Sequence, residues 1–220
     1  MPLPPSVSAV VFDCDGLLLD TESCWSRAEA ALFGDYGFGF GPNEKDLLIG
    51  RTLEAACDNM AEYFGLPGAG SQLLADLVPR VEAELSAKVE PTPGARQLLE
   101  SLQGRVPIAV ATNSPRAMLS AALKSSGLAE FFDVSVASDE VEHAKPHPDL
   151  YLTAFDRLGA APQAGVAFED SSTGVAAARA VRMFLVTVTS QPDKHLDGDY
   201  ITSTLDDFTL IEWARTVRKI

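Results

Sequence analysis

The sequence predicts an α/β protein with a three-layer core, in which helices cover both faces of a parallel sheet, and with an all-helical segment inserted after the first strand. Residues 8–12 (SAVVF) form a short apolar run with β-branched residues, which is typical of a buried strand. From residue 95 onward, helical and strand patterns alternate, which favours a parallel sheet. Between these two parts, residues 21–88 show helical patterns that are separated by glycine-rich breaks.

The individual elements follow from these patterns. The core helices are predicted at residues 95–102, 116–126, 148–158, 173–180 and 206–218. The strands between them are predicted at residues 107–111, 134–137, 165–168 and 183–187. The helices of the insert are predicted at residues 22–33, 44–49, 52–64 and 72–87. We therefore assign residues 1–19 and 90–220 to the core and residues 20–89 to a helical domain.

Composition and charge argue against several classes of protein. Hydrophobic residues make up 46% of the chain, yet no apolar run approaches the roughly 20 residues that span a bilayer. The net charge of −14 argues against nucleic-acid binding, because phosphate backbones require clustered Lys and Arg. The N-terminus lacks the pattern of a secretory signal. The three cysteines (Cys14, Cys24 and Cys57) are widely spaced and fit a reducing cytosol, so we expect a cytoplasmic protein.

Polar side chains follow the predicted strands, and ligands of such sheets lie beyond the carboxyl ends of the strands. Asp13 and Asp15 follow the first strand, and because side chains two apart on an extended chain point the same way, both can face one site while Cys14 faces away. An acidic turn is the alternative interpretation. A calcium loop is not supported, because Leu17 and Cys24 stand where ligands belong.

A hydroxyl and an amide follow the next strand. Thr112 and Asn113 are candidates for direct phosphate contacts. Pro115 fits the first position of a helix, with Ser114 as its N-cap, and such a helix start offers free N–H groups to an anion.

A loop that contains one lysine and two prolines comes next. Lys145 lies in the segment AKPHPD, and a positive charge fixed there can neutralise phosphate and the Asp13 carboxylate. A solvated surface lysine is the alternative. His143 and His147 have a spacing seen in zinc sites, but the prolines interrupt the helix that would align them, so we expect both to be loop residues.

Two acidic residues follow the strand predicted at residues 165–168. Glu169 and Asp170 supply carboxylate oxygens, which suit Mg²⁺ because this ion prefers oxygen ligands and keeps part of its hydration. The alternative is that Asp170 or Ser171 merely caps the helix that follows.

Taken together and in this order, these residues resemble the motifs of the haloacid dehalogenase superfamily of phosphotransferases. The segment 13–22 (DCDGLLLDTE) resembles the first motif, and Thr112, Lys145 and the pair Glu169-Asp170 resemble the second, third and fourth. The helical insert is similar to the small C1 cap shared by β-phosphoglucomutase and many sugar-phosphate phosphatases. The resemblance implies a three-layer Rossmann-like parallel sheet core with an inserted all-α cap domain.

The resemblance also implies a chemistry. Asp13 would attack phosphorus and become a phosphoryl-aspartate, while Asp15 protonates the leaving alcohol and then accepts a proton from water. Mg²⁺ would be held by Asp13, the backbone carbonyl of Asp15 and Asp170, with Glu169 in or near the shell. The oxygens of the transferring phosphoryl group would be bound by Thr112, Asn113 and Lys145. The cap would open and close over the site, and because closure needs no partner chain we expect a monomer.

The expected activity is Mg²⁺-dependent hydrolysis of a small phosphate ester, such as a sugar phosphate. A mutase of the β-phosphoglucomutase type is an alternative, which is weakened because Trp25 and Leu53 stand at or near the positions of that enzyme's sugar-binding histidine and arginine. A non-catalytic phosphometabolite-binding protein is a further alternative. In the cap, Arg51 is a candidate contact for an anionic part of the substrate, or an exposed helix-start residue. Trp25 and Phe38 are candidates to line a cap pocket, or packing residues.

Overall fold

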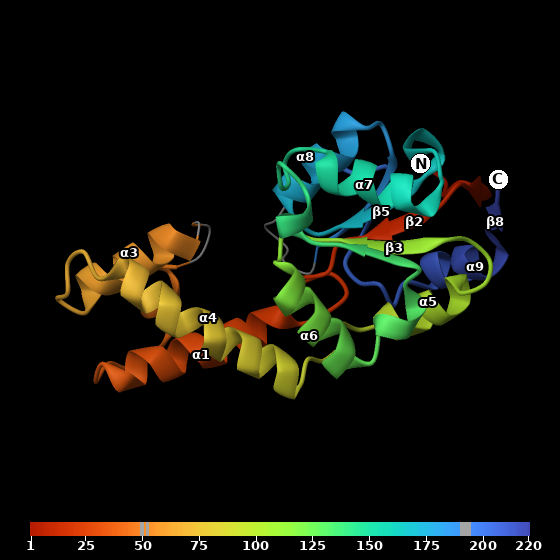
Figure 1. Cartoon of the computed structure of the whole chain (residues 1–220). Helices are drawn as coiled ribbons and strands as arrows, with labels where there is room; N and C mark the ends of the chain where they lie inside the picture. Colours follow the sequence, from red (N-terminus) through yellow and green to blue (C-terminus); the bar gives the residue numbers. More distant parts are fainter. Residues whose placement is uncertain (49–50, 52, 190–194) are drawn as a thin grey trace. The chain divides into compact units, whose positions relative to one another are not determined.

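A computed structural model of the chain describes residues 1–48, 51, 53–189 and 195–220. The chain divides into two compact units (Figure 1). The core unit comprises Met1–Asp20 and Glu90–Ile220, and the helical unit comprises Thr21–Val89. Among the described residues, no helix is both long enough and apolar enough to span a membrane.

The core unit is built on a parallel sheet, as the sequence predicts. Within the described part of the chain the sheet has six strands in the order β4-β3-β2-β5-β6-β7, and each neighbouring pair is parallel. The strands are β2 (Val10–Phe12), β3 (Ile108–Ala111), β4 (Val134–Val136), β5 (Val166–Glu169), β6 (Phe184–Val188) and β7 (Tyr200–Thr202).

The first strand of this sheet lies between two strands from distant parts of the sequence. Phe12 of β2 is paired with Val110 of β3 on one side and with Phe168 of β5 on the other. The order of strands along the chain therefore reverses at β2. Because all three strands run in the same direction, their carboxyl ends meet at one edge, which is where α/β sheets of this kind bind ligands.

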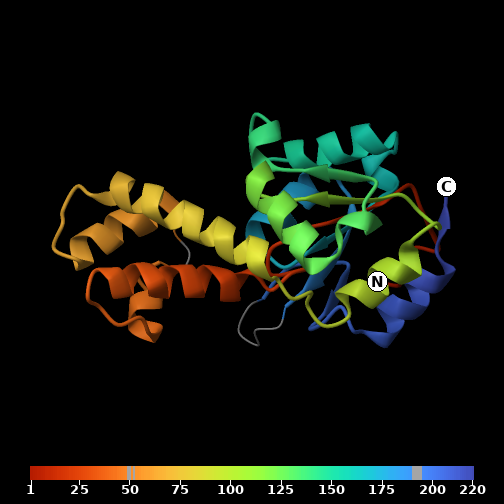
Figure 2. The same ribbon diagram turned by 60° about the horizontal axis from the view of Figure 1, so that its bottom comes forward.

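Helices cover both faces of the sheet (Figures 1 and 2). On one face, side chains of α7 and α8 join alternate strand residues such as Val11, Ala109 and Ala167 in a single buried cluster. On the opposite face, the rings of Phe12 and Phe168 stack at 4.6 Å, and Phe168 meets Trp213 of α9 at 6.1 Å. The core helices are α5 (Ala95–Leu102), α6 (Arg116–Ser126), α7 (Asp149–Leu158), α8 (Ser172–Ala180) and α9 (Phe208–Thr216).

The two ends of the chain form a pairing that sequence patterns do not predict. Strands β1 (Ser6–Val7) and β8 (Arg218–Lys219) form a two-stranded parallel sheet. The helix predicted to reach Arg218 therefore ends at Thr216. The amide of Arg218 instead donates a hydrogen bond to the carbonyl oxygen of Pro5, and Trp213 Nε1 donates to that of Pro4.

The helical unit contains α1 (Thr21–Asp35), α2 (Pro42–Lys45), α3 (Leu53–Tyr63) and α4 (Gly70–Ala87). Helix α4 packs against both α1 and α3. Helix α2 ends earlier than the predicted 44–49, because the amides of Leu47 and Leu48 bond to carbonyls three residues back, as in a turn. Residues 49 and 52 of the predicted helices lie outside the described part of the chain.

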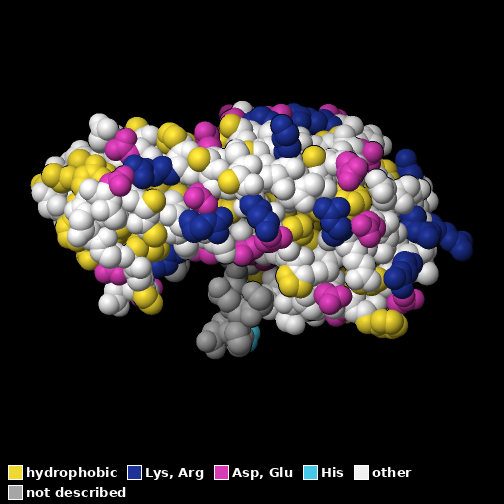
Figure 3. All heavy atoms as spheres, turned by 90° about the horizontal axis from the view of Figure 1, so that it is seen from below, with side chains coloured by type: hydrophobic (Ala, Val, Ile, Leu, Met, Phe, Trp, Pro, Cys, Tyr) yellow, Lys and Arg dark blue, Asp and Glu magenta, His cyan; other side chains and the backbone are white. Residues whose placement is uncertain are grey.

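An aromatic cluster stabilises the helical unit. The ring of Phe33, which is fully buried, contacts Phe40, Tyr63 and Phe64 at centroid distances of 4.8–5.7 Å. Phe38 packs on Tyr63 and Phe64 at 5.2 Å, so it serves packing and does not line the pocket described below. Hydrophobic side chains gather on the surface of this unit, and basic and acidic side chains are interspersed on the same view (Figure 3).

Candidate active site

Two acids follow β2 at the edge where the central strands end. The amide of Asp13 donates to the carbonyl oxygen of Phe168 over 3.0 Å, so Asp13 continues the pairing of β2 with β5. Asp13 is buried, whereas Asp15 is half-buried. Gly16 then turns the chain with a φ of +77°, a conformation that favours glycine. The two acids have different partners, and these define two halves of the site.

The Asp15 carboxylate is held by two hydroxyl groups. Thr112 Oγ1 and Ser114 Oγ each donate a hydrogen bond of 2.8 Å to Asp15 Oδ2. Ser114 is therefore not the N-cap that the sequence predicts, since α6 begins at Arg116 and Pro115 occupies the cap position. A signal for this role was available, because Ser114 follows Thr112 at the spacing that places two side chains on one side of an extended chain.

Lys145 joins two other acids. Its Nζ lies 2.6 Å from Asp13 Oδ1 and 2.7 Å from Glu169 Oε1, and its side chain is 2% exposed. Burial acts to lower the pKa of Lys145, but the two carboxylates outweigh it and raise this pKa above its ordinary value. The lysine is a buried charge with two partners and not the surface residue of the alternative interpretation.

Asn113 positions the loop that carries this lysine. The amide of Lys145 donates to Asn113 Oδ1 over 2.8 Å, and Asn113 Nδ2 donates to the carbonyl oxygen of Lys145 over 3.1 Å. Both polar ends of the Asn113 side chain thus bond to one residue of the neighbouring loop. A contact between Asn113 and phosphate stays a prediction.

Tyr151 is a member of the site that sequence reasoning missed. Its hydroxyl donates a hydrogen bond of 2.6 Å to Glu169 Oε1, and Lys145 Nζ lies 5.0 Å from the centre of its ring. Burial, followed by the Glu169 carboxylate, raises the pKa of Tyr151 well above its ordinary value, so the phenol keeps its proton. Its place on the buried face of a helix made it look like an ordinary core residue.

Glu169 is surrounded by hydrogen-bond donors. The residue is fully buried, Oε1 accepts from Lys145 and Tyr151, and Oε2 accepts from Ser171 Oγ over 3.1 Å. Helix α8 begins directly against it, since a Cβ added at Gly174 would lie 1.8 Å from Glu169 Oε1. Ser171 also caps α8, because its side chain accepts a hydrogen bond from the amide of Gly174.

The acids of the core unit offer a donor set for a cation. Asp13, Glu169 and Asp170 each present a carboxylate oxygen within 4.8 Å of the others. Burial raises the pKa of Asp13 well above its ordinary value, the Lys145 ammonium opposes this rise, and the nearby carboxylates add to it. One lysine does not balance this many acids, so an all-oxygen set of this kind fits a hard divalent cation such as Mg²⁺.

The free space and the hydrogen bonds around Asp13, Glu169 and Asp170 differ, and this bears on which of them would bind a metal ion. A Cβ added at Gly16 would lie 2.7 Å from Asp170 Oδ2, so only glycine leaves room beside that carboxylate. Glu169 already accepts three hydrogen bonds from protein groups. Asp13 and Asp170 are therefore the better-placed ligands, and Glu169 is better placed to balance the charge of Lys145.

The remaining candidates lie elsewhere. The rings of His143 and His147 stack at 4.6 Å in the loop before α7, and His143 Nδ1 lies 3.2 Å from Asp149 Oδ2, so both are the loop residues that the sequence predicts. Arg51 belongs to the helical unit, where its Nε donates to the carbonyl oxygen of Leu47 over 2.9 Å.

The parallel sheet with this constellation at its edge defines a class of protein, and comparison with known sequences names it. The chain belongs to the haloacid dehalogenase-like hydrolases, since the model of that family matches residues 10–188. This confirms the resemblance that the motifs indicate, and the family's fold agrees with the observed core.

Individual relatives cover most of the chain. The chain is 34% identical over 181 residues to fructose-1-phosphate phosphatase YqaB of Escherichia coli K12, covering 82% of this chain and 96% of that protein. It is 32% identical over 212 residues to the bifunctional riboflavin kinase/FMN phosphatase of Arabidopsis thaliana. That match covers 94% of this chain but 56% of the relative, so the chain spans little more than half of the plant protein's length.

A solved structure shows the same fold. The crystal structure of a haloacid dehalogenase family hydrolase from Deinococcus radiodurans, with bound phosphate and sodium, matches with a TM-score of 0.76 and 26% sequence identity. The match covers 97% of this chain and 99% of that one.

Proposed function

We propose that the protein is a Mg²⁺-dependent phosphatase that hydrolyses a small phosphorylated metabolite, such as a sugar phosphate, through a phosphoryl-aspartate on Asp13. One observation carries this proposal. Of the two acids that follow β2, Asp13 is paired with a buried lysine, whereas Asp15 is held by the hydroxyls of Thr112 and Ser114. This difference suits two roles, a nucleophile beside a cation and an acid/base group.

The first step transfers the phosphoryl group to the protein. A carboxylate oxygen of Asp13 bonds to phosphorus as the bond between phosphorus and the ester oxygen breaks. Asp15 gives its proton to that ester oxygen, so the product leaves as an alcohol. Both hydroxyl donors bond to Asp15 Oδ2, so we assign the transferred proton to Oδ1.

The second step releases phosphate. Asp15, now ionised, accepts a proton from a water molecule as the water oxygen bonds to phosphorus. The bond between phosphorus and the Asp13 carboxylate breaks, and inorganic phosphate leaves. Both acids return to their starting states, and water is consumed once for each ester.

Positive charge must balance the phosphoryl oxygens in both steps. Lys145 supplies one charge beside Asp13. Thr112 and Asn113 directly follow β3, and we assign to them, with Lys145, the binding of the phosphoryl oxygens. Mg²⁺, when bound, would neutralise charge between the nucleophile and the phosphoryl group. Asp13, Asp170 and the backbone carbonyl of Asp15 would hold it, with Glu169 in or next to the shell.

The relatives support a small phosphate ester as substrate, since one of them is named for fructose 1-phosphate and another for FMN. We place the enzyme in the cytoplasm as a monomer. Its three cysteines, Cys14, Cys24 and Cys57, are all buried and form no disulfide, which suits a reducing compartment.

The experiment measures release of p-nitrophenol from p-nitrophenyl phosphate with Mg²⁺ and with EDTA. Activity is expected only with the metal. Asp13→Asn should lower kcat by about 10³-fold or more, and Asp15→Asn by about 10²–10⁴-fold for an alkyl phosphate. Asp156→Asn, an exposed acid of α7, is the matched control and should change nothing.

Three outcomes would contradict the proposal. Turnover retained in Asp13→Asn would remove this residue as the nucleophile. Folded protein that binds phosphate esters without any metal-dependent release would instead be a binding protein. Formation of glucose 6-phosphate from β-glucose 1-phosphate, with no net release of phosphate, would identify a mutase.

A further inference from the structure

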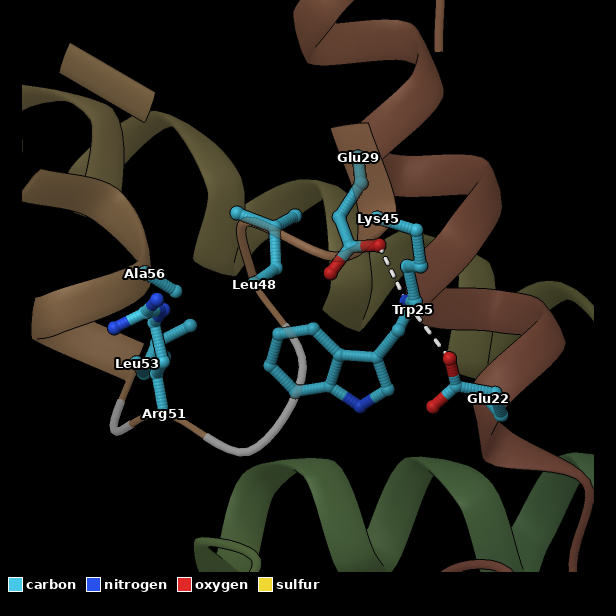
Figure 4. A pocket seen from close by; sticks show the side chains of 8 residues that line it. All are labelled: Glu22, Trp25, Glu29, Lys45, Leu48, Arg51, Leu53 and Ala56. Atoms are coloured by element: carbon cyan, nitrogen blue, oxygen red, sulfur yellow. Dashed lines mark hydrogen bonds and ion pairs between the residues drawn. The ribbon is translucent and has the colours of Figure 1, made fainter. Parts of the chain in front are cut away.

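The helical unit contains a pocket of its own, with a volume of about 350 Å³ (Figure 4). Trp25 and Arg51 are among the residues that line it. On one wall, Lys45 Nζ lies 2.6 Å from Glu29 Oε2 and 2.8 Å from Glu22 Oε1. The ammonium group of Lys45 therefore already occupies the place that a metal ion would need beside these two carboxylates.

A different group of titratable side chains lies in the core unit, in the loop before α7. The spacing of His143 and His147 is typical of zinc ligands on a helix, and here a turn takes the place of the helix. The amide of His147 donates a hydrogen bond of 3.0 Å to the carbonyl oxygen of Ala144, so the chain turns back on itself. The two imidazole rings stack with their centroids 4.6 Å apart. The loop thus places two possible nitrogen ligands side by side.

Asp149 orients the first of these rings. Its Oδ2 lies 3.2 Å from His143 Nδ1 and accepts a hydrogen bond of 3.2 Å from the backbone amide of His143. Because a carboxylate only accepts hydrogen bonds, Nδ1 of the neutral ring carries the proton and Nε2 keeps its lone pair. A carboxylate that holds the far nitrogen in this way is the usual support of a metal-binding histidine.

Both rings are accessible to an ion from solvent. The side chain of His143 is 50% exposed, and His147 is exposed as well. Two charged imidazolium rings in contact would repel each other, so the stack favours the neutral rings, which are the form that binds metals. Two nitrogens that each bond to one Zn²⁺ at about 2.0–2.1 Å lie roughly 3.3 Å apart. Rings that already stack need only rotate to share such an ion.

The segment between the two histidines is already ordered. Lys145, midway between them, is fixed both through its backbone and through its buried side chain. Pro146 and Pro148 restrict the backbone on either side of His147. An ion bound here would order little that is not ordered already, which favours affinity.

We propose that His143 and His147 bind a divalent transition-metal ion of the Zn²⁺ class, with Asp149 orienting the first ligand and water completing the shell. Imidazole suits such ions, whereas Mg²⁺ prefers oxygen ligands, so this site and the carboxylates of Asp13 and Asp170 would take different metals. The bound ion would close residues 143–147 into a ring that includes the segment carrying the active-site lysine. The site goes beyond the proposed function and does not depend on it.

The test is titration calorimetry of the full chain with ZnCl₂ in excess Mg²⁺, and it needs no turnover. One Zn²⁺ should bind at the histidines of each chain. His143→Asn and His147→Asn should each abolish this binding, and Asp149→Asn should weaken it about tenfold. His195→Asn is the matched control, because His195 is the third histidine of the chain, is exposed and lies outside the loop. This variant should bind Zn²⁺ as the wild type does.

Zn²⁺ can also displace Mg²⁺ from the active-site carboxylates, so the titration is repeated with Asp170→Asn. Binding in this variant that is lost when His147→Asn is added would support the histidine site. Binding that is lost in Asp170→Asn but retained in His147→Asn would overturn it, and so would equal binding by the wild type and both histidine variants. Zinc binding that depends on His147 in a protein with no phosphatase activity would support the site and contradict the proposed function.

Discussion

Asn113 and Lys145 are joined by two hydrogen bonds between the amide side chain of one and the backbone of the other. Asn113 follows β3, and Lys145 lies in the loop between β4 and α7. The pair therefore ties two loops together at the sheet edge and sets the point from which the lysine side chain reaches Asp13. Asn113 thus affects the site by setting the position of Lys145.

Loss of the two hydrogen bonds between Asn113 and Lys145 should lower the catalytic rate more than it lowers the stability of the fold. Asn113→Ala is expected to lower kcat for p-nitrophenyl phosphate about tenfold, because misplaced charge no longer matches the transition state. Asn113→Asp keeps the acceptor for the Lys145 amide but loses the donor, so its effect should be smaller. Steady-state kinetics of the three proteins measure this, and equal kcat values in all three would show that the tie has no catalytic role.

Tyr151 and Tyr63 provide a matched pair of buried and exposed hydrogen bonds to glutamate. Tyr151→Phe removes a donor from fully buried Glu169 while keeping the ring, and should lower the free energy of unfolding by about 1.5–3 kcal/mol. Tyr63→Phe removes the exposed hydrogen bond to Glu44 and should change the free energy of unfolding by less than about 0.5 kcal/mol. Urea unfolding of both variants measures the difference, and similar values for the two would contradict a special role for the buried bond.

Two glycines in helices should respond in opposite ways to alanine. A Cβ at Gly174 would overlap Glu169, so Gly174→Ala should destabilise the protein by about 1–3 kcal/mol and lower kcat. Gly34 in α1 has no atom within 4 Å of an added Cβ, so Gly34→Ala should be neutral or stabilise by up to about 1 kcal/mol. Thermal unfolding and p-nitrophenyl phosphate hydrolysis test the pair. A fully active, fully stable Gly174→Ala would show that Glu169 can move at no cost.

Cys57 should make stability depend on alkaline pH. Burial, helped by Asp58 and Glu54, raises the pKa of its thiol to about 11. In the unfolded chain the thiol ionises from about pH 8.5, so between these values the folded state binds more protons and stability falls as pH rises. The contribution is at most about 1.4 kcal/mol per pH unit.

The measurement is the free energy of unfolding in urea for the wild type and for Cys57→Ala, each at about pH 7 and about pH 10. Other groups also ionise in this range, so the difference between the two proteins isolates the thiol. The wild type should lose more stability than the variant. Equal losses would show that the buried thiol does not resist ionisation.

Local sequence patterns were sufficient to predict the helices with the clearest patterns. Helices α5 and α6 have the predicted bounds, 95–102 and 116–126, because each combines a periodic apolar face with a clear stop. Strands β1, β7 and β8 were missed, since they have two or three residues each and exist through pairing with distant segments. The residues around each of these strands do not show which distant segment it will pair with.

The residues of the candidate site also fall into those that local sequence indicates and those that only the fold brings together. Sequence could indicate Asp13 and Asp170, because each is a charged residue that follows an apolar strand, and Lys145, because it is the one lysine of a loop with two prolines. It could not assign Ser114 to Asp15 or Tyr151 to Glu169, because those partners lie 99 and 18 residues away. A hydroxyl or a phenol shows its role only when the fold supplies its acceptor.

The position of β2 between β3 and β5 has a consequence for synthesis on the ribosome. At roughly 5–20 residues per second, the chain between Phe12 and its partner Phe168 takes on the order of 10 s to emerge. For that time the apolar first strand has no completed sheet to join. The helical unit, an unbroken stretch from Thr21 to Val89, is complete much earlier. The nascent chain is therefore expected to carry a folded insert beside an unpaired, aggregation-prone strand, which is the kind of segment that chaperones shield.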